Sequence, residues 1–139
     1  MEIADEECKY TPMGSPVEVG MLNWLIENDI AVQDLLVKRE RTQPLRTLIP
    51  FSSIRKRMVV AYQTSEDTVR IVVKGAPEFV IPMCTQQLDD INDTEEFGED
   101  QHAEYLEGVS ATIKTDEFDC LKPLTFGYRD MDLDAFEDL

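Results

Sequence analysis

One aromatic ring, several basic side chains and a glycine stand next to two neighbouring predicted strands, and their chemistry suits a nucleotide. Phe51 precedes the basic run Arg55-Lys56-Arg57, and Lys74-Gly75 follows an apolar strand. If the strands on either side of residues 65–67 pair, these groups meet at one end of a hairpin. The ring can then stack on a base, the ammonium groups can neutralise phosphates, and the glycine leaves the backbone bare.

Each of these residues also has a purely structural explanation. An aromatic residue at a strand start usually belongs to the core. A basic run such as Arg55-Lys56-Arg57 can be a solvated strand edge that discourages edge-to-edge pairing. Lys74-Gly75 can simply end a strand and begin a turn. The nucleotide interpretation therefore depends on the combination and order of the residues, and not on any one of them.

The elements that must position these groups follow from the hydrophobic pattern. The strong apolar run Met58–Tyr62 predicts a central strand. The predicted strands are 45–51, 56–64, 68–74 and 121–128, and the predicted helices are 16–28, 31–39, a short one from Pro77, and 100–118. This order predicts an α+β fold: a twisted, mainly antiparallel β-sheet with helices packed against it.

The first helix has a strong local start signal. Ser15-Pro16-Val17-Glu18 combines an N-cap serine, proline at the first helical position and glutamate at the third. This pattern is typical of a capping box, in which Ser15 and Glu18 each accept a hydrogen bond from the backbone of the other. Glu18 therefore has a structural role independent of any ligand.

The charge of the chain excludes some classes of partner. The formal net charge is −16, and residues 88–139 hold 17 of the 29 acidic residues but only three of the 13 basic ones. Such a chain will not bind nucleic acid or an anionic membrane through general attraction. An anionic nucleotide needs a local basic site, and Arg55-Lys56-Arg57 with Lys74 supplies it. The three cysteines are far apart, which predicts reduced thiols and no zinc site.

The composition also divides the chain. We expect an N-terminal segment 1–13 that is a loop or a short edge strand, a domain 14–130, and a loosely held acidic tail 131–139. Within the domain, residues 86–101 are rich in Asp, Glu and Asn and predict a solvated loop. No apolar run reaches the length of a membrane-spanning helix, and no secretion signal is visible at the start.

Four segments resemble the successive signatures of the nucleotide-binding (N) domain of P-type ATPases, over about residues 12–131. The segment Lys74-Gly75-Ala76-Pro77-Glu78 is the most specific and points to cation pumps. Phe51-Ser52-Ser53-Ile54-Arg55-Lys56-Arg57-Met58 is similar to calcium-pump sequences. The other two are Gly14-Ser15-Pro16-Val17-Glu18 and Leu121-Lys122-Pro123-Leu124 with Tyr128-Arg129-Asp130.

The resemblance implies an ATP site made of Glu18, Phe51, Arg55, Lys56, Lys74, Gly75, Lys122 and Leu124. Phe51 would stack on adenine, Glu18 would accept from its exocyclic amine, and Leu124 would pack beside it. Lys74 would lie deep near the base and Lys56 nearer the phosphates, with Arg55 beside it, while Gly75 would let the backbone approach. Lys122 stands where the family usually has arginine, so it keeps the charge but loses the two-pronged fork.

The resemblance also implies a division of labour. The family's phosphorylated aspartate lies in an Asp-Lys-Thr-Gly motif that is absent here, as are membrane helices and some strands expected before the first helix. We therefore expect an excised or shortened N domain that binds ATP without hydrolysing it. In a parent pump it would be a cytoplasmic domain of a multi-pass membrane protein. There it would present ATP to an aspartate on a phosphorylation domain, with an actuator domain as the other partner and Mg²⁺ held mainly outside this chain.

The sequence is also compatible with two other classes of function to different degrees. The chain could be an acidic protein-interaction module that keeps the same scaffold without nucleotide affinity. A free-standing ATP hydrolase is disfavoured because the sequence offers no nucleophile–base pair and no P-loop.

Overall fold

The structure, a computed structural model, describes residues 13–88, 93–114 and 121–139. It forms two compact units, Met1–Thr42 and Gln43–Leu139. All but the last residue of the predicted N-terminal segment 1–13 lies outside the described residues.

The first unit contains two helices, α1 (Pro16–Glu27) and α2 (Val32–Thr42). The predicted capping box of α1 is confirmed: the backbone N–H of Glu18 donates to Ser15 Oγ at 3.4 Å, and the Glu18 carboxylate accepts from the backbone of Ser15. The second helix runs three residues past the predicted end at 39. Arg39 and Arg41 lie in its last turn, where positive charge favours a helix C-terminus.

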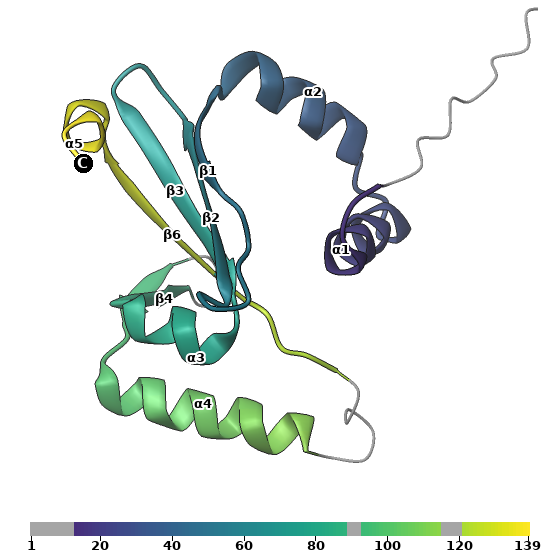
Figure 1. The fold of residues 1–139 in the computed structure, drawn as a ribbon, viewed down its shortest axis with the longest axis vertical. Coiled ribbons are helices and arrows are strands. Elements are labelled where there is room, and N and C mark those ends of the chain that lie inside the picture. The colour runs from purple at the N-terminus through teal and green to yellow at the C-terminus, as the bar shows by residue number, and fades with distance from the viewer. Residues whose placement is uncertain (1–12, 89–92, 115–120) are drawn as a thin grey trace, which may run out of the picture. The chain divides into compact units, whose positions relative to one another are not determined.

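The second unit is built on a four-stranded antiparallel sheet in the order β1-β2-β3-β6 (Figure 1). The strands are β1 (Leu45–Ile49), β2 (Arg57–Gln63), β3 (Thr68–Gly75) and β6 (Thr125–Asp132). The first three follow one another as a meander, and β6 returns along the free side of β3. The twisted antiparallel sheet with helices confirms the predicted α+β class.

The core of the second unit lies between one face of this sheet and the segment that follows β3. That segment forms the short helix α3 (Pro77–Val80), as predicted, and a 3₁₀ turn, η1 (Ile81–Met83). Val80 and Ile81 are buried, as are Ala61 and Val69 of the sheet. Contact is close at Gly127 on β6, where a Cβ atom would lie 3.3 Å from Val73 and 3.7 Å from Val80.

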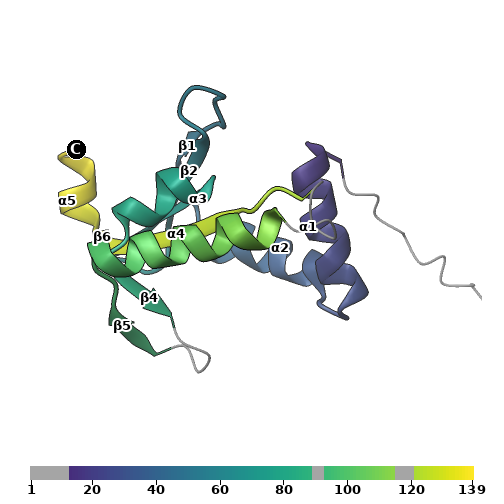
Figure 2. The same cartoon turned by 90° about the horizontal axis from the view of Figure 1, so that it is seen from below.

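The region predicted as a solvated loop, 86–101, is different in the structure. It contains a two-stranded hairpin of β4 (Gln86–Leu88) and β5 (Thr94–Glu96), and helix α4 (Glu99–Ile113) already begins within it. Figure 2 shows this hairpin projecting from the chain just ahead of α4. Phe97, between the hairpin and the helix, is buried and makes edge-on ring contacts with His102 and Tyr105 of α4.

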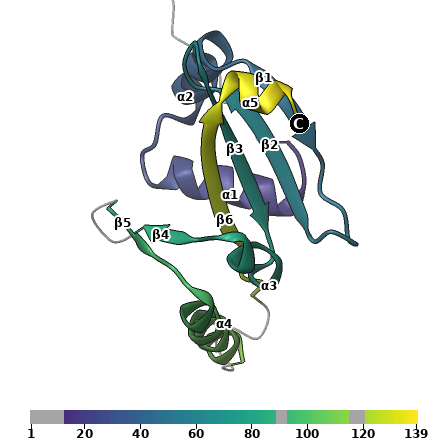
Figure 3. The ribbon, with the colours of Figure 1, turned by 90° about the vertical axis from the view of Figure 1, so that its left-hand side faces the viewer.

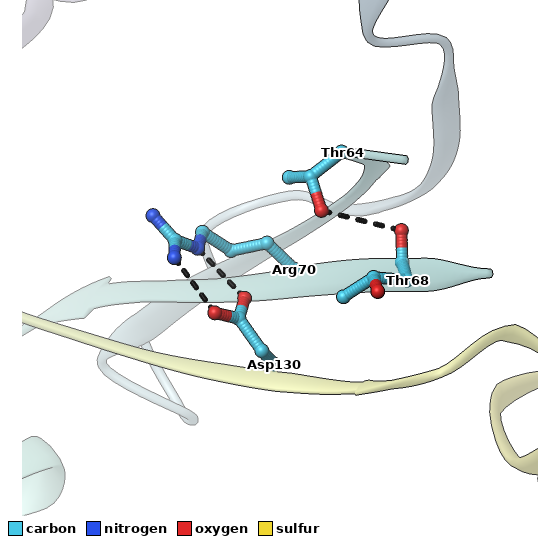
Figure 4. Close-up of polar contacts among 4 residues, drawn as sticks. All are labelled: Thr64, Thr68, Arg70 and Asp130. Carbon is cyan, nitrogen blue, oxygen red and sulfur yellow. Dashed lines mark hydrogen bonds and ion pairs between the residues drawn. The ribbon is translucent and has the colours of Figure 1, made fainter. Parts of the chain in front are cut away.

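The C-terminal end also differs from the prediction of a loose tail. Strand β6 begins at Thr125, later than the predicted 121, and continues to Asp132. Helix α5 (Leu133–Glu137) follows it directly. This shift of four residues is explained by the ladder with β3, which runs from the Thr68–Asp132 pair to the Gly75–Thr125 pair without a break. Figure 4 shows Arg70 and Asp130 paired across this ladder, near the turn that Thr64 and Thr68 close by a hydrogen bond.

Candidate nucleotide-binding site

One end of the four-stranded sheet gathers seven of the eight predicted site residues. The register places Arg57 opposite Gly75, and Gly75 opposite Thr125. The β1–β2 loop (residues 50–56), the end of β3 and the segment 121–124 before β6 therefore all lie at the same end of the sheet (Figure 3). The predicted residues at this end are Phe51, Arg55, Lys56, Lys74, Gly75, Lys122 and Leu124.

The β1–β2 loop is held by hydrogen bonds of its own. Ser52 Oγ accepts from the backbone N–H groups of Ile54 and Arg55, at 3.3 and 3.5 Å. The carbonyl of Ser52 accepts from the N–H of Lys56 at 2.7 Å. One guanidinium nitrogen of Arg55 donates to the carbonyl of Pro50, also at 2.7 Å. A loop without regular secondary structure thus has a defined path between Phe51 and Lys56.

Lys56 has an unusual backbone conformation at the point where this loop enters β2. Its φ angle is +55°, in the left-handed region that side chains other than glycine seldom adopt. The carbonyl of Lys56 accepts a hydrogen bond from the N–H of Ala76 at 3.1 Å. The end of the loop is thereby attached to the end of β3.

Gly75 lies against this attachment. A Cβ atom at Gly75 would be 2.6 Å from the carbonyl oxygen of Lys56 and 2.7 Å from Cβ of Arg57. These distances are shorter than any real Cβ contact, so only glycine fits. The space left by the missing side chain at Gly75 is occupied by the neighbouring strand.

The side chains of the site differ in exposure. The Phe51 ring is 60% exposed, so it is not part of the core. Arg55, Lys56 and Lys122 are exposed, Leu124 is 37% exposed, and Lys74 is half-buried between Met58 and Phe126 in the strand register. An exposed ring beside exposed cations can be reached by a ligand from solution.

The electrostatics of this sheet end oppose those of the whole chain. The loop 50–57, the pair Lys74-Gly75 and the segment 121–126 together contain five basic side chains and no carboxylate. The chain as a whole carries a net charge of −16. A local cluster of cations attracts an anion, and within these three segments phosphate groups would meet no acidic side chain.

Two cavities of this unit are less suited to a nucleotide. One, of about 420 Å³, is lined by Pro123 and by Tyr105, Gly108, Val109, Thr112 and Ile113 of α4, and no charged residue faces it. The other, of about 480 Å³, is lined by Glu96 and neutral residues around Phe97. The first offers nothing to bind phosphate, and the second presents a carboxylate that would repel it.

The eighth predicted residue, Glu18, lies in the first unit, at the start of α1. Its Oε2 atom accepts from Ser15 Oγ at 2.9 Å, in addition to the backbone contact of the capping box. The capping role is thus present in the structure, and the contact of Glu18 with adenine stays a prediction.

Ser52 is a residue of this site that the sequence reasoning did not single out. A signal for it was available, because a serine followed by a short polar loop can close a turn with its hydroxyl. What the sequence did not reveal is that this turn also fixes Lys56.

None of the helices in the described ranges combines the length and the apolar character that crossing a membrane requires. Within the same ranges, acidic, histidine and cysteine side chains nowhere gather in a group of three or more that could hold a metal ion.

Comparison with known proteins identifies what the chain is similar to. Residues 2–138 match the domain family described as P-type ATPase, cytoplasmic domain N. The calcium-transporting ATPase 10, plasma membrane-type, of Oryza sativa subsp. japonica is 27% identical over 130 residues, which is 94% of this chain and 12% of that protein. The protein of the same name from Arabidopsis thaliana is 33% identical over 88 residues, 63% of this chain and 8% of its own length. The chain thus spans only a small part of these relatives.

Proposed function

Because the chain belongs to the family of P-type ATPase cytoplasmic N domains, we propose that it binds ATP at the end of the sheet formed by the β1–β2 loop, the end of β3 and residues 121–124. The observation that carries this proposal is the convergence there of an exposed aromatic ring and five basic side chains, with no carboxylate in the three segments. Both halves of a nucleotide, the base and the phosphates, find complementary groups.

The roles of the residues follow from their chemistry and their place. Phe51 stacks on adenine, because base–aromatic stacking needs an accessible ring face. Lys74, half-buried in β3, lies toward the base, while the exposed Lys56 and Lys122 lie toward the phosphates, with Arg55 adding charge beside Lys56. Leu124 packs against the adenine edge.

The residues of this site do not form a principal ligand set for the Mg²⁺ that accompanies ATP. Magnesium prefers carboxylate, phosphate and water oxygens, and the three segments of the site contain no carboxylate. The metal would therefore be held by the nucleotide itself and by another domain. No chemical step at the phosphates is assigned to residues of this chain.

In a longer pump the domain would act by delivery. It would hold ATP through the base so that the γ-phosphate reaches an aspartate on a separate phosphorylation domain, since phosphoryl transfer depends chiefly on positioning and charge neutralisation. The phosphorylation and actuator domains would be its partners, on the cytoplasmic side of a cation-transporting protein. The isolated chain would bind ATP and release no phosphate.

An ATP titration of the full 139-residue chain followed by NMR tests the proposal. We expect chemical-shift changes at Phe51, Lys74 and Gly75 at millimolar ATP. The variant Phe51→Ala should weaken binding about five- to 150-fold through lost stacking. Its unfolding temperature should be unchanged, because the ring is exposed.

The control is Tyr105→Ala, which removes a 53%-exposed aromatic ring from α4, an element outside the three segments of the site. It should bind ATP as the natural chain does. If the natural chain shows no shifts at millimolar ATP, the proposal is wrong, and the alternative of an acidic interaction module on the same scaffold is favoured. Steady phosphate release by the pure chain would instead indicate a free-standing hydrolase.

A further inference from the structure

We infer that Ser52 is a positioning residue for the proposed ATP site: its hydroxyl fixes the β1–β2 loop so that Phe51 and Lys56 face the ligand together. The inference depends on the proposed function and adds to it a residue that touches neither base nor phosphate. It is drawn from the hydrogen bonds of the loop.

Few groups hold the β1–β2 loop in place. Between the end of β1 at Ile49 and the start of β2 at Arg57 there is no strand partner. Ser52 takes part in three of the loop's hydrogen bonds, through Oγ to the N–H groups of Ile54 and Arg55 and through its carbonyl to the N–H of Lys56. Removing the hydroxyl would release the two N–H groups at the middle of the loop.

The loop must hold Lys56 in a left-handed backbone conformation. Lys56 keeps a φ of +55°, a conformation that a lysine backbone leaves readily unless its surroundings impose it. On one side it is held by the carbonyl of Ser52, and on the other its own carbonyl accepts from Ala76 N–H. The Ser52 turn and the end of β3 together therefore impose the conformation of Lys56.

Gly75 has an indirect role in the site. The position of its missing Cβ lies 2.6 Å from the Lys56 carbonyl oxygen and 2.9 Å from Cα of Arg57. The glycine makes room for the end of the loop on β3, and this accounts for it without any contact to ligand. Ser52 and Gly75 thus secure the two sides of the same lysine.

The conformation of the β1–β2 loop bears directly on ATP binding. Phe51 and Lys56 lie on either side of the Ser52 turn, and the proposed function requires them to contact the base and the phosphates of one molecule. A loop that loses the Ser52 hydroxyl samples other paths, and the two groups then reach the ligand together for only part of the time. Binding should weaken although neither contact residue has changed.

The test compares loop variants of the full chain by calorimetric ATP titration. Ser52→Ala should weaken ATP binding about three- to tenfold, the usual effect of one lost hydrogen-bonding group. Ser52→Asn should restore it, because asparagine closes the same kind of turn with its side-chain oxygen. Ser53→Ala is the matched control, since the hydroxyl of Ser53 is not part of this set of bonds, and it should bind as the natural chain does.

A double-mutant cycle distinguishes positioning from a general loss of stability. If Ser52 acts partly through Lys56, the loss caused by Ser52→Ala should shrink when Lys56 is already alanine. Equal losses in both backgrounds, or no rescue by Ser52→Asn, would overturn the inference. Should Ser52→Ala not fold, Ser52→Thr and Ser52→Val give a pair of equal shape with and without the hydroxyl, and only the threonine variant should bind normally.

The outcomes also separate this inference from the proposed function. If Phe51→Ala weakens ATP binding while Ser52→Ala leaves it unchanged, the positioning role is wrong and the ATP site stands. If the natural chain does not bind ATP, both are wrong.

Discussion

Arg70 and Asp130 stand directly opposite each other on β3 and β6 and form a two-pronged ion pair, with both nitrogen–oxygen distances at 2.7 Å. The guanidinium carbon of Arg70 also lies 4.4 Å from the centroid of the Tyr128 ring. The pair sits near the end of the β3–β6 ladder that is remote from Gly75. It therefore holds β6 in register at one end while the candidate site occupies the other.

The ion pair predicts a specific pH dependence of stability. Hydrogen bonding from Arg70 lowers the pKa of Asp130 below its ordinary value of about 4, although burial acts weakly in the opposite direction. A lowered pKa in the folded state stabilises the fold at pH values above the ordinary one, and this contribution is lost as the pH falls through the lowered pKa. Asp130→Asn should cost about 0.2–1 kcal/mol at pH 7, because both side chains are partly exposed.

Urea unfolding of the natural chain and Asp130→Asn between pH 7 and strongly acidic pH measures this contribution. The difference in the free energy of unfolding should disappear at the acidic end. A difference of the same size at both ends would mean that the carboxylate charge contributes nothing.

The left-handed backbone of Lys56 predicts that stability and binding change separately. Lys56→Gly and Lys56→Ala remove the same charge, but only glycine adopts a φ of +55° without steric cost. Lys56→Gly should therefore be about 0.5–1 kcal/mol more stable than Lys56→Ala, after allowance for the greater freedom of glycine in the unfolded chain. Both should bind ATP more weakly than the natural chain, as thermal unfolding and ATP titration of the same samples will show. Equal stability of the two variants would argue that the lysine backbone is not strained.

The close approach at Gly75 predicts a destabilising substitution. Gly75→Ala places a Cβ within 3 Å of two backbone atoms and one side-chain carbon, and none of them is the end of a flexible chain. The free energy of unfolding should fall by about 1–3 kcal/mol, which denaturant titration measures.

Gly108→Ala provides the comparison for this substitution. Gly108 lies inside α4 and no atom stands within 4 Å of its Cβ position, so alanine there should stabilise the chain by about 0.5–1 kcal/mol. Changes of the same sign and size at both glycines would contradict the packing described at Gly75.

The lysine at position 122 predicts a gain of binding. Lys122→Arg supplies a planar fork that can contact phosphate oxygens with two N–H groups, so ATP should bind about two- to fivefold tighter. Adenosine, which lacks phosphates, should bind both forms equally. Lys114→Arg, at the end of α4, is the control and should change neither affinity. A gain for adenosine as large as that for ATP would place Lys122 away from the phosphates.

Local signals in the sequence predicted the structure where a few neighbouring residues decide it. The capping box at Ser15 and Glu18 and the proline that starts α3 are of this kind. Strand β2 was predictable because Met58–Tyr62 is almost entirely apolar, and β3 because of its apolar residues Val69, Ile71, Val72 and Val73. The register that joins Gly75 to Thr125 supports the grouping of predicted site residues from three separate segments.

Predictions failed where pairing with another segment decides the structure. Gln86–Leu88 and Thr94–Glu96 are polar, with no apolar alternation to mark them as strands, and they become strands only by pairing with each other. Strand β6 continues through Asp130 because Arg70 faces it from β3, 60 residues earlier. The left-handed Lys56 could not be foreseen for the same reason, since the N–H that holds it belongs to Ala76, the residue that follows β3.

The hydrogen bond from Lys56 N–H to the Ser52 carbonyl has a consequence for how this chain can vary. It closes a ring of fixed size, and the lysine carbonyl is at the same time attached beside Gly75, so inserting or deleting a single amino acid between positions 52 and 56 would break one connection or the other. Among natural variants, the length of this stretch should stay constant while its exposed positions change freely. A fluorescent reporter for nucleotide is therefore better introduced by exchanging the exposed Ile54 for a labelled cysteine than by lengthening the chain at this point.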